Sequence, residues 1–211
     1  MKIGIVGSGN VGGTLGKLWA KKGHSVVFSS RDPGSDEMKR LVADAGASAS
    51  AASVPDAASR SEVILLATPW KAAKDAIQQC GELSGKIVID AVNPLLPDVS
   101  GLEIGTSTSS AEQVASWAPD AKVVKAFNTV GFNIMANPVF DDRRALLFYC
   151  GDNAEAKKVV NQLASELGFD PADAGPLTRA RLLEPFAMLW ISLAFTPGHG
   201  REFAFLMMKR S

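Results

Sequence analysis

A glycine-rich turn near the start of the chain constrains the fold more than any other feature of the sequence. The segment Gly7-Ser8-Gly9-Asn10-Val11-Gly12 has glycine at its first, third and sixth positions. It directly follows an apolar run at residues 2–6, which is typical of a buried strand, and it opens a helical pattern of apolar residues at 10–22. A strand, a glycine turn and a helix in this order predict the dinucleotide-binding start of a Rossmann fold.

Each glycine of this turn has a mechanical reason to be glycine. Gly7 permits the tight turn, Gly9 lets the backbone approach a pyrophosphate, and Gly12 lets the helix pack closely on the strand. The unpaired amides at the start of the helix then form an anion-binding site. We therefore expect these three residues to hold the phosphates of a dinucleotide.

Further along the chain, short apolar runs alternate with helical patterns, which favours βαβ units around a parallel sheet. We expect residues 94–110 and 131–144 to be irregular. The predicted fold class is α/β: a Rossmann-type, doubly wound, mostly parallel sheet with a small, helix-rich C-terminal part. The expected elements are strands at 24–29, 62–68, 86–90 and 122–127, helices at 36–45, 71–80 and 111–117, and a short edge strand with a helical turn within 47–59.

The pattern changes near residue 142, which predicts a Rossmann domain at 1–142 and a small C-terminal part at 143–211. We expect this part to complete the acceptor site and to make a homodimer contact. The apolar tail at 203–208 either packs on the rest of the chain or belongs to that contact. The last helix has apolar side chains on all its faces and should be buried. The other elements expected here are a strand at 145–150, a helix at 154–167, an extended piece at 169–173, and a helix from 178 to near the end with an apolar stripe of Leu182, Phe186, Leu189, Trp190 and Leu193.

The residues after the second strand decide between the two common dinucleotides. An NAD site usually places a carboxylate about 20 residues beyond the glycines, where it accepts from the ribose diol. Here Ser30 and Arg31 stand at the end of the strand, and Asp32, one residue later, should point elsewhere. Arg31 can pair with a 2′-phosphate through two parallel hydrogen bonds, and Ser30 can donate beside it. These residues predict NADP(H) as the cofactor.

Composition excludes several other functions. Lys+Arg and Asp+Glu both number 22, so the net charge gives no reason to expect nucleic acid or an anionic membrane as a partner. Cys80 and Cys150 make neither a disulfide framework nor a metal-ligand spacing, so we expect no metal. The longest apolar stretch, at about 186–195, is too short to span a bilayer. Because residues 1–2 lead straight into the first strand, we expect a cytoplasmic protein without a signal peptide.

Three turns should face the nicotinamide, because ligands of open parallel sheets lie beyond the carboxyl ends of the strands. The turns are Thr68-Pro69-Trp70, Asn93-Pro94-Leu95 and Asn128-Thr129. Asn93 and Asn128 either hydrogen-bond the carboxamide or are ordinary turn residues. Trp70 either stacks on a ring or belongs to the core.

We predict no acid-base catalytic residue at these turns. The single tyrosine, Tyr149, lies within an expected strand, and Asn153 rather than a lysine follows four positions later. His24 stands at the start of the second strand, at the wrong end of the sheet. A carbonyl or imine reductase normally needs a positioned proton donor, whereas hydride transfer between two rings chiefly needs their alignment. The sequence therefore favours a ring-shaped acceptor.

Several motifs together resemble those of the NADPH:coenzyme F420 oxidoreductase family. The resemblance covers nearly the whole chain and extends to the NADPH-oxidising domain of the STEAP metalloreductases, to which Ala126-Phe127-Asn128-Thr129-Val130 is similar. The motifs shared with the first family are the glycine turn, Ser30-Arg31, Thr68-Pro69-Trp70, Cys150-Gly151-Asp152 and Asp173-Ala174-Gly175-Pro176-Leu177.

The resemblance implies an often dimeric protein in which hydride passes between NADPH and a flavin or 5-deazaflavin ring. Ser35 departs from the family pattern, because it stands where an F420-using relative would carry a further basic residue. By the resemblance, the pyrophosphate would be lined by Ser8, Gly9, Asn10 and Val11, the 2′-phosphate held by Ser30 and Arg31, and the cofactor flanked by Thr68 and Pro69.

The identity of the acceptor stays open at this point. The first hypothesis is F420, or FMN or FAD with onward reduction of a metal. The second is an NADP-dependent dehydrogenase or imine reductase of the β-hydroxyacid or pyrroline-carboxylate type, and the third is a non-catalytic NADP-binding sensor. We expect the second ring near Gly175-Pro176-Leu177 and the helix from about Arg179 to Met188. Arg179 and Arg181 either meet an acceptor's phosphate or carboxylates or form a solvated face.

Overall fold

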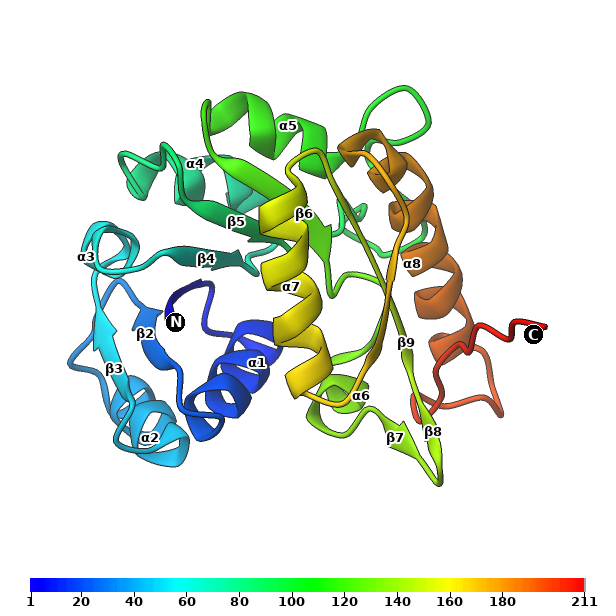
Figure 1. Cartoon of the computed structure of the whole chain (residues 1–211), viewed down its shortest axis with the longest axis horizontal. Helices are drawn as coiled ribbons and strands as arrows, with labels where there is room; N and C mark the ends of the chain where they lie inside the picture. The colour runs from blue at the N-terminus through cyan, green and yellow to red at the C-terminus, as the bar shows by residue number, and fades with distance from the viewer. Residues whose placement is uncertain (211) are drawn as a thin grey trace.

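Within residues 1–210, which the computed structural model describes, eight strands form one sheet in the order β10-β9-β6-β5-β4-β1-β2-β3 (Figure 1). This arrangement confirms the predicted Rossmann-type α/β fold. The strands are β1 (Lys2–Val6), β2 (Ser25–Ser29), β3 (Ala49–Ala52), β4 (Val63–Leu66), β5 (Ile87–Asp90), β6 (Lys122–Ala126), β9 (Leu146–Gly151) and β10 (Asp170–Asp173), and β7 (Val139–Phe140) and β8 (Arg143–Arg144) make a separate hairpin.

The helices fall between the strands largely as the apolar patterns predict. Ser35, Ser53, Ser109 and Asn153 cap four of them with side-chain oxygens. The helices are α1 (Asn10–Lys21), α2 (Asp36–Ala45), α3 (Val54–Ser59), α4 (Trp70–Gln79), α5 (Ser110–Trp117), α6 (Phe132–Ala136), α7 (Ala154–Glu166) and α8 (Ala180–Phe195), preceded by the 3₁₀ turn η1 (Leu177–Arg179).

The order of the strands determines where a ligand can bind. Strand order reverses between β1 and β4, and the strands from β3 to β6 are all parallel, so their carboxyl ends share one edge of the sheet. That edge is where ligands of such sheets bind. β9 runs antiparallel to β6, and β10 is parallel to β9, so both end at the opposite edge.

Two apolar layers cover the faces of the sheet. One layer joins α1, α2, α6 and α7 to the sheet through residues such as Trp19 and Leu163, and the other joins α3, α4, α5 and the start of α8 through residues such as Ile77 and Leu183. β9 and β10 extend the same sheet, so the C-terminal part of the chain shares its core with the Rossmann part. α7 packs against both of these strands, and the ring of Phe186 in α8 packs edge-on against that of Phe148 in β9. Among residues 1–210, no helix combines the length and apolarity that a bilayer crossing requires.

Two sequence-based expectations about local structure are wrong. Residues 131–144 are not irregular, because they contain α6 and the β7–β8 hairpin. The last helix does not continue to near the end but stops at Phe195, because Thr196 precedes Pro197 and must leave the helical region. The segment after it packs on α8: the indole nitrogen of Trp190 donates to the carbonyl of Phe203 at 3.1 Å.

Apart from Trp190, the predicted apolar stripe of α8 is not the buried face either. Leu182 and Leu189 are 59% and 49% exposed. Small residues let a different face of the helix approach the sheet closely, and that face includes a carboxylate. The buried residues of α8 are Ala180, Leu183, Glu184, Ala187, Trp190 and Ala194.

Candidate functional site

The glycine turn between β1 and α1 is held so tightly that two of its glycines have no room for a side chain. Gly7 has a φ of +101°, and a Cβ there would lie 2.6 Å from the carbonyl of Ala67. A Cβ on Gly12 would overlap the carbonyl oxygen of Gly7 and lie 2.8 Å from Ile5. These contacts bring the start of α1 close to the sheet, as the spacing of the glycines predicts.

The start of α1 has the form of an anion-binding site. Gly9 is its N-cap residue, and no side chain caps the first amides. A Cβ built on Gly9 would meet nothing within 4 Å, so the space in front of these amides is open. The Ser8 hydroxyl donates to the carbonyl of Ser29 at 2.9 Å, which ties the turn to the end of β2. Asn10 and Val11, the first residues of α1, both reach the surface.

The residues after β2 leave one cation available beside this turn. Arg31 is exposed, and no acidic side chain within residues 1–210 pairs with it. The carboxylate of Asp32 accepts from the amide of Gly34 at 3.1 Å, so it points into its own loop. The hydroxyl of Ser30 accepts from the amide of Asp32 at 3.1 Å, and Ser35 caps α2. An unpaired guanidinium next to an open helix start fits a nucleotide with an additional phosphate.

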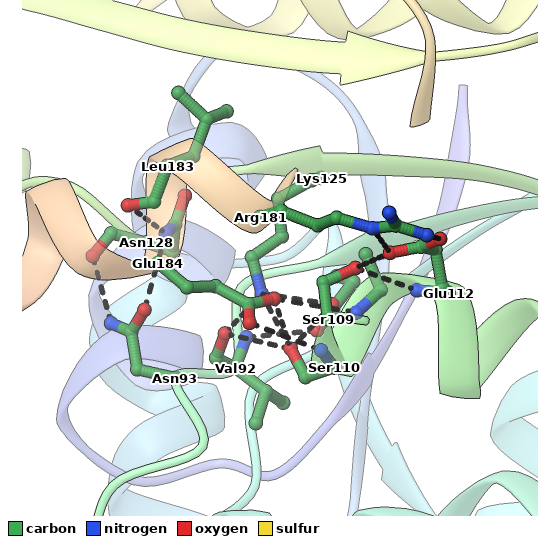
Figure 2. Close-up of polar contacts among 12 residues, drawn as sticks. Val92, Asn93, Ser109, Ser110, Glu112, Lys125, Asn128, Arg181, Leu183 and Glu184 are labelled. Carbon is green, nitrogen blue, oxygen red and sulfur yellow. Dashed lines mark hydrogen bonds and ion pairs between the residues drawn. The ribbon is translucent and has the colours of Figure 1, made fainter. Parts of the chain in front are cut away.

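The residues that follow β4, β5 and β6 lie at the same edge of the sheet. The Asn93 side chain donates to the carbonyl of Asn128 at 2.8 Å, and the Asn128 side chain donates to Asn93 Oδ1 at 3.1 Å (Figure 2). Asn128 also donates to the carbonyl of Leu183 in α8 at 3.2 Å. The structure therefore brings two of the predicted nicotinamide-side residues into contact and links them to the C-terminal part.

Two buried polar atoms at this edge have no hydrogen-bond partner among the described residues. They are the hydroxyl of Thr68 and Oδ1 of Asn128. Because buried polar groups are normally paired, unpaired ones at a strand edge fit a polar ligand such as a carboxamide. Pro69, next to Thr68, is exposed and is the N-cap residue of α4.

Trp70 belongs to the packing between helices. Its ring stacks on Trp117 of α5 with centroids 5.4 Å apart and an interplanar angle of 25°. Of the two readings of this residue, the structure supports the core aromatic.

A cluster of charged residues below this edge was missed by the sequence analysis. Lys125, Asp90 and Glu184 are all fully buried. The ammonium of Lys125 lies 3.0 Å from Asp90 Oδ2 and 2.9 Å from Glu184 Oε1, and it donates to the hydroxyl of Ser110 at 2.7 Å and to the carbonyl of Val92 (Figure 2). Strands β5 and β6 and helices α5 and α8 therefore meet at one ammonium group.

The electrostatics of the cluster favour a charged lysine. Burial alone lowers the pKa of Lys125, but the two carboxylates outweigh burial and hold that pKa above its ordinary value. Burial raises the pKa of Asp90, against the opposing effect of Lys125, and nearby Glu184 raises it further. Glu184 also accepts from the amides of Ser110 at 3.1 Å and Ala111 at 3.4 Å, so the positive end of α5 compensates part of its charge.

One segment that was expected to contact the second ring lies far from the nicotinamide edge, so this part of the expectation is wrong. The carbonyl of Gly175 accepts from the amide of Gly151 at the end of β9, and because β9 runs antiparallel to β6, this end points toward the start of β6. The segment Gly175-Pro176-Leu177 thus lies at the edge of the sheet opposite to the glycine turn. Arg181 also lacks a free charge for an acceptor, because its guanidinium binds Glu112 at 2.9 and 2.6 Å.

Neither residue considered as a proton donor faces the candidate site. The hydroxyl of Tyr149 accepts from Asn161 of α7 at 3.2 Å. His24, at the other end of β2, lies 2.7 Å from a carboxylate oxygen of Glu166.

Comparison with known proteins gives consistent results. Residues 2–94 match the family described as NADP oxidoreductase, coenzyme F420-dependent. The chain is 31% identical over 209 residues to the F420-dependent NADP reductase of Methanocaldococcus jannaschii, with 92% of each chain covered. It is 34% identical over 184 residues to the metalloreductase STEAP3 of Rattus norvegicus. That alignment covers 87% of this chain but only 36% of the rat protein.

Solved structures support the same fold. A protein from Arthrobacter sp. FB24, assigned provisionally as an F420-dependent NADP reductase, is 30% identical with a TM-score of 0.89, covering 99% of this chain and 100% of that one. A reductive aminase from Aspergillus terreus has a TM-score of 0.67 at 17% identity, covering 90% of this chain and 60% of that one. At that identity the second match shows a shared fold alone.

Proposed function

Because the chain belongs to the family of F420-dependent NADP reductases, we propose that it transfers hydride between NADP(H) and the 5-deazaflavin F420. Its relatives are NADP reductases and metalloreductases, and the chain is an NADPH-dependent oxidoreductase. The observation that carries the proposal is the pairing of an open, uncapped start of α1 with an unpaired Arg31 after β2.

These residues fit the two charged parts of NADPH. The amides that follow Gly9 are available for the pyrophosphate, and Arg31 with Ser30 is available for the 2′-phosphate. The unpartnered atoms of Thr68 and Asn128 are available for the carboxamide of the nicotinamide ring. When bound, NADPH supplies the hydride, and the task of the chain is to orient the ring that carries it.

The groups at the nicotinamide edge support a ring-shaped acceptor. Thr68, Asn93 and Asn128 provide a hydroxyl and two amides, which orient a ligand by hydrogen bonds but do not titrate near neutral pH. The nearby amine, that of Lys125, is fully buried and surrounded by oxygens. Such an edge suits transfer between two aligned rings better than reduction that requires a proton from the protein.

The test is an acceptor screen with the purified protein and NADPH. We expect F420 to lose its absorbance near its 420 nm band as NADPH is oxidised, and the reverse reaction to proceed from reduced F420 and NADP. A small imine and a small ketone serve as the comparison substrates. Oxidation of NADPH by these compounds, without any reaction of F420, would favour the imine reductase or dehydrogenase alternative. If none of the acceptors oxidises NADPH, the non-catalytic sensor would be favoured.

A second candidate is the reduction of FMN or FAD with onward electron transfer to a metal. The match to the rat metalloreductase supports the metal as a final acceptor and says nothing about the flavin. The chain spans about a third of that relative, so electron transfer onward to a metal is a separate proposal. The same screen with FMN and FAD, followed by a ferric chelate, tests it.

A further inference from the structure

The buried cluster of Lys125, Asp90 and Glu184 lies directly beneath the two asparagines of the nicotinamide edge. Asp90 ends β5 and Lys125 lies within β6, while Asn93 and Asn128 follow these strands. Glu184 follows Leu183, whose carbonyl accepts from Asn128. Along the chain, Asp90 and Lys125 are therefore each three residues away from one of the asparagines, and Glu184 is next to the residue that contacts Asn128.

The first connection runs through Val92. Its amide donates to Asp90 Oδ1 at 2.9 Å, and its carbonyl accepts from the ammonium of Lys125. The peptide groups on both sides of Val92 are thus fixed by charged partners. Asn93 is the next residue, so its side chain starts from a backbone that cannot rotate freely.

The second connection runs through α8. Glu184 pairs with Lys125 and accepts from the start of α5, and these contacts fix the position of α8 along its own axis relative to the sheet. In that position the Leu183 carbonyl lies 3.2 Å from Asn128 Nδ2. With both hydrogens of this amide directed to Leu183 and Asn93, Oδ1 of Asn128 is left as the atom without a partner.

The backbone between Lys125 and Asn128 is strained, which makes this support necessary. Phe127 has a φ of +62°, a conformation that bulky residues rarely adopt. Its ring is held between Trp19 and Phe169, with centroids 5.7 and 6.1 Å away. A strained residue persists where its surroundings fix it on both sides, and here the cluster fixes one side and the aromatic core the other.

We propose that Lys125, Asp90 and Glu184 are positioning residues that align Asn93 and Asn128 with the nicotinamide ring. The proposal rests on the proposed function in one respect: it assumes that the nicotinamide ring of NADPH binds at the edge formed by Thr68, Asn93 and Asn128. The cluster acts through Val92 and Leu183 and touches no ligand. A buried ion cluster contributes little net stability, but it fixes the positions of the groups that form it, because each of its hydrogen bonds has a preferred direction.

The test separates binding of the nicotinamide from binding of the rest of the nucleotide. The variant is Glu184→Gln, which keeps the shape of the side chain and removes its charge. Dissociation constants are measured for NADPH and for 2′-phospho-ADP-ribose, which lacks the nicotinamide. We expect the constant for NADPH to rise about tenfold, as for the loss of one or two hydrogen bonds, and the constant for the fragment to change less than about twofold. The emission of bound reduced nicotinamide should move toward that of free NADPH.

Glu112→Gln is the matched control. It breaks the Arg181–Glu112 ion pair, which joins the same helices α5 and α8 but contacts neither Val92 nor Leu183. We expect both dissociation constants to stay within about twofold of those of the unaltered protein. An equal loss of the nicotinamide contribution in both variants would mean that any loosening of the helices suffices, and would overturn the proposal.

Glu184→Asp covers the case in which Glu184→Gln fails to fold. It keeps the charge but withdraws the carboxylate by one methylene, so a partial loss of the nicotinamide contribution is expected. If a folded Glu184 variant keeps the same ratio between the dissociation constants for NADPH and for 2′-phospho-ADP-ribose as the unaltered protein, the proposal is wrong. These measurements use no acceptor, so failure of the unaltered protein to reduce F420 would contradict the proposed function and leave the positioning role standing.

Discussion

Replacing Arg31 by alanine tests whether this side chain selects the cofactor. Arg31 is exposed and has no ion-pair partner within the described residues, so its removal breaks no ion pair among them. The unfolding temperature should therefore stay unchanged. Any change in nucleotide binding then reports the loss of a ligand contact.

The expected magnitude follows from the exposure of this site. A hydrogen bond to a charged group contributes about 1.5–3 kcal/mol net. Screening by solvent and salt at an exposed site reduces this, so we take about 2 kcal/mol for the whole guanidinium fork, or roughly a 30-fold rise in the dissociation constant for NADPH. The constant for NADH should change less than about twofold, because NADH lacks the 2′-phosphate.

Fluorescence titration of both nucleotides at two salt concentrations measures the effect. Arg31→Lys keeps the charge but not the fork and should lie between the alanine variant and the unaltered protein. Arg40→Ala, which removes an exposed charge from α2, controls for the general field of the protein. Equal losses for NADPH and NADH, or an equal effect of Arg40→Ala, would refute the assignment of the 2′-phosphate to Arg31.

Three further outcomes are expected. Gly9→Val should abolish binding of NADPH, seen in the same titration, yet leave the unfolding temperature within a few degrees, because a Cβ there meets no protein atom within 4 Å; retained binding would remove the pyrophosphate from this turn. Hydrogen bonding by Arg181 lowers the pKa of Glu112 below its ordinary value of 4.5, so the pair stabilises the fold above that pH and loses its effect as the pH falls through the folded-state pKa. Glu112→Gln should therefore reduce stability toward urea at pH 7 and have a smaller effect at pH 3, and an equal effect at both would contradict the ion pair. The exposed Leu182 and Leu189 of α8 predict a homodimer, so Leu189→Glu should give a monomer by light scattering, whereas a monomeric unaltered chain would contradict the dimer.

The Rossmann architecture was predictable because its signals are local. The glycine turn, the apolar runs and the caps each act within a few residues, and the structure places β1, α1, α2 and β4 close to the expected bounds. Arg31 and Asp32 were also separable from sequence, because adjacent residues at the end of a strand point in different directions.

The direction of β9 was not predictable in the same way. An apolar run such as that at 146–151 reads alike in parallel and antiparallel pairing, since both bury the strand. The register in the structure, in which Val124 pairs with Gly151 and Ala126 pairs with Tyr149, shows that β9 is reversed. That reversal carries the segment after β10 to the edge away from the glycine turn, and the expected acceptor contact at Gly175-Pro176-Leu177 is lost with it.

The charged cluster left weak signals that could have been combined. Lys125 stands in a strand whose neighbours are apolar, Asp90 ends another such strand, and Glu184 interrupts an apolar helix. Each charge alone is compatible with an exposed face. A buried charge must find a partner, so three isolated charges in apolar elements are together a reason to expect one cluster, but the choice of partners depends on tertiary packing.

The chemistry of the contact between β6 and α8 explains why charges are used at that point. Elsewhere the end of α8 packs through Trp190 and Ala194, and such apolar contacts tolerate small shifts along the helix axis. A shift of one ångström at Leu183 would break its hydrogen bond to Asn128, because such bonds weaken steeply with distance and angle. The ion pair of Lys125 with Glu184 resists that shift, since moving α8 would separate two buried opposite charges. Directional contacts therefore occur where the position of the Asn128 amide depends on the register of a helix, and apolar contacts suffice where it does not.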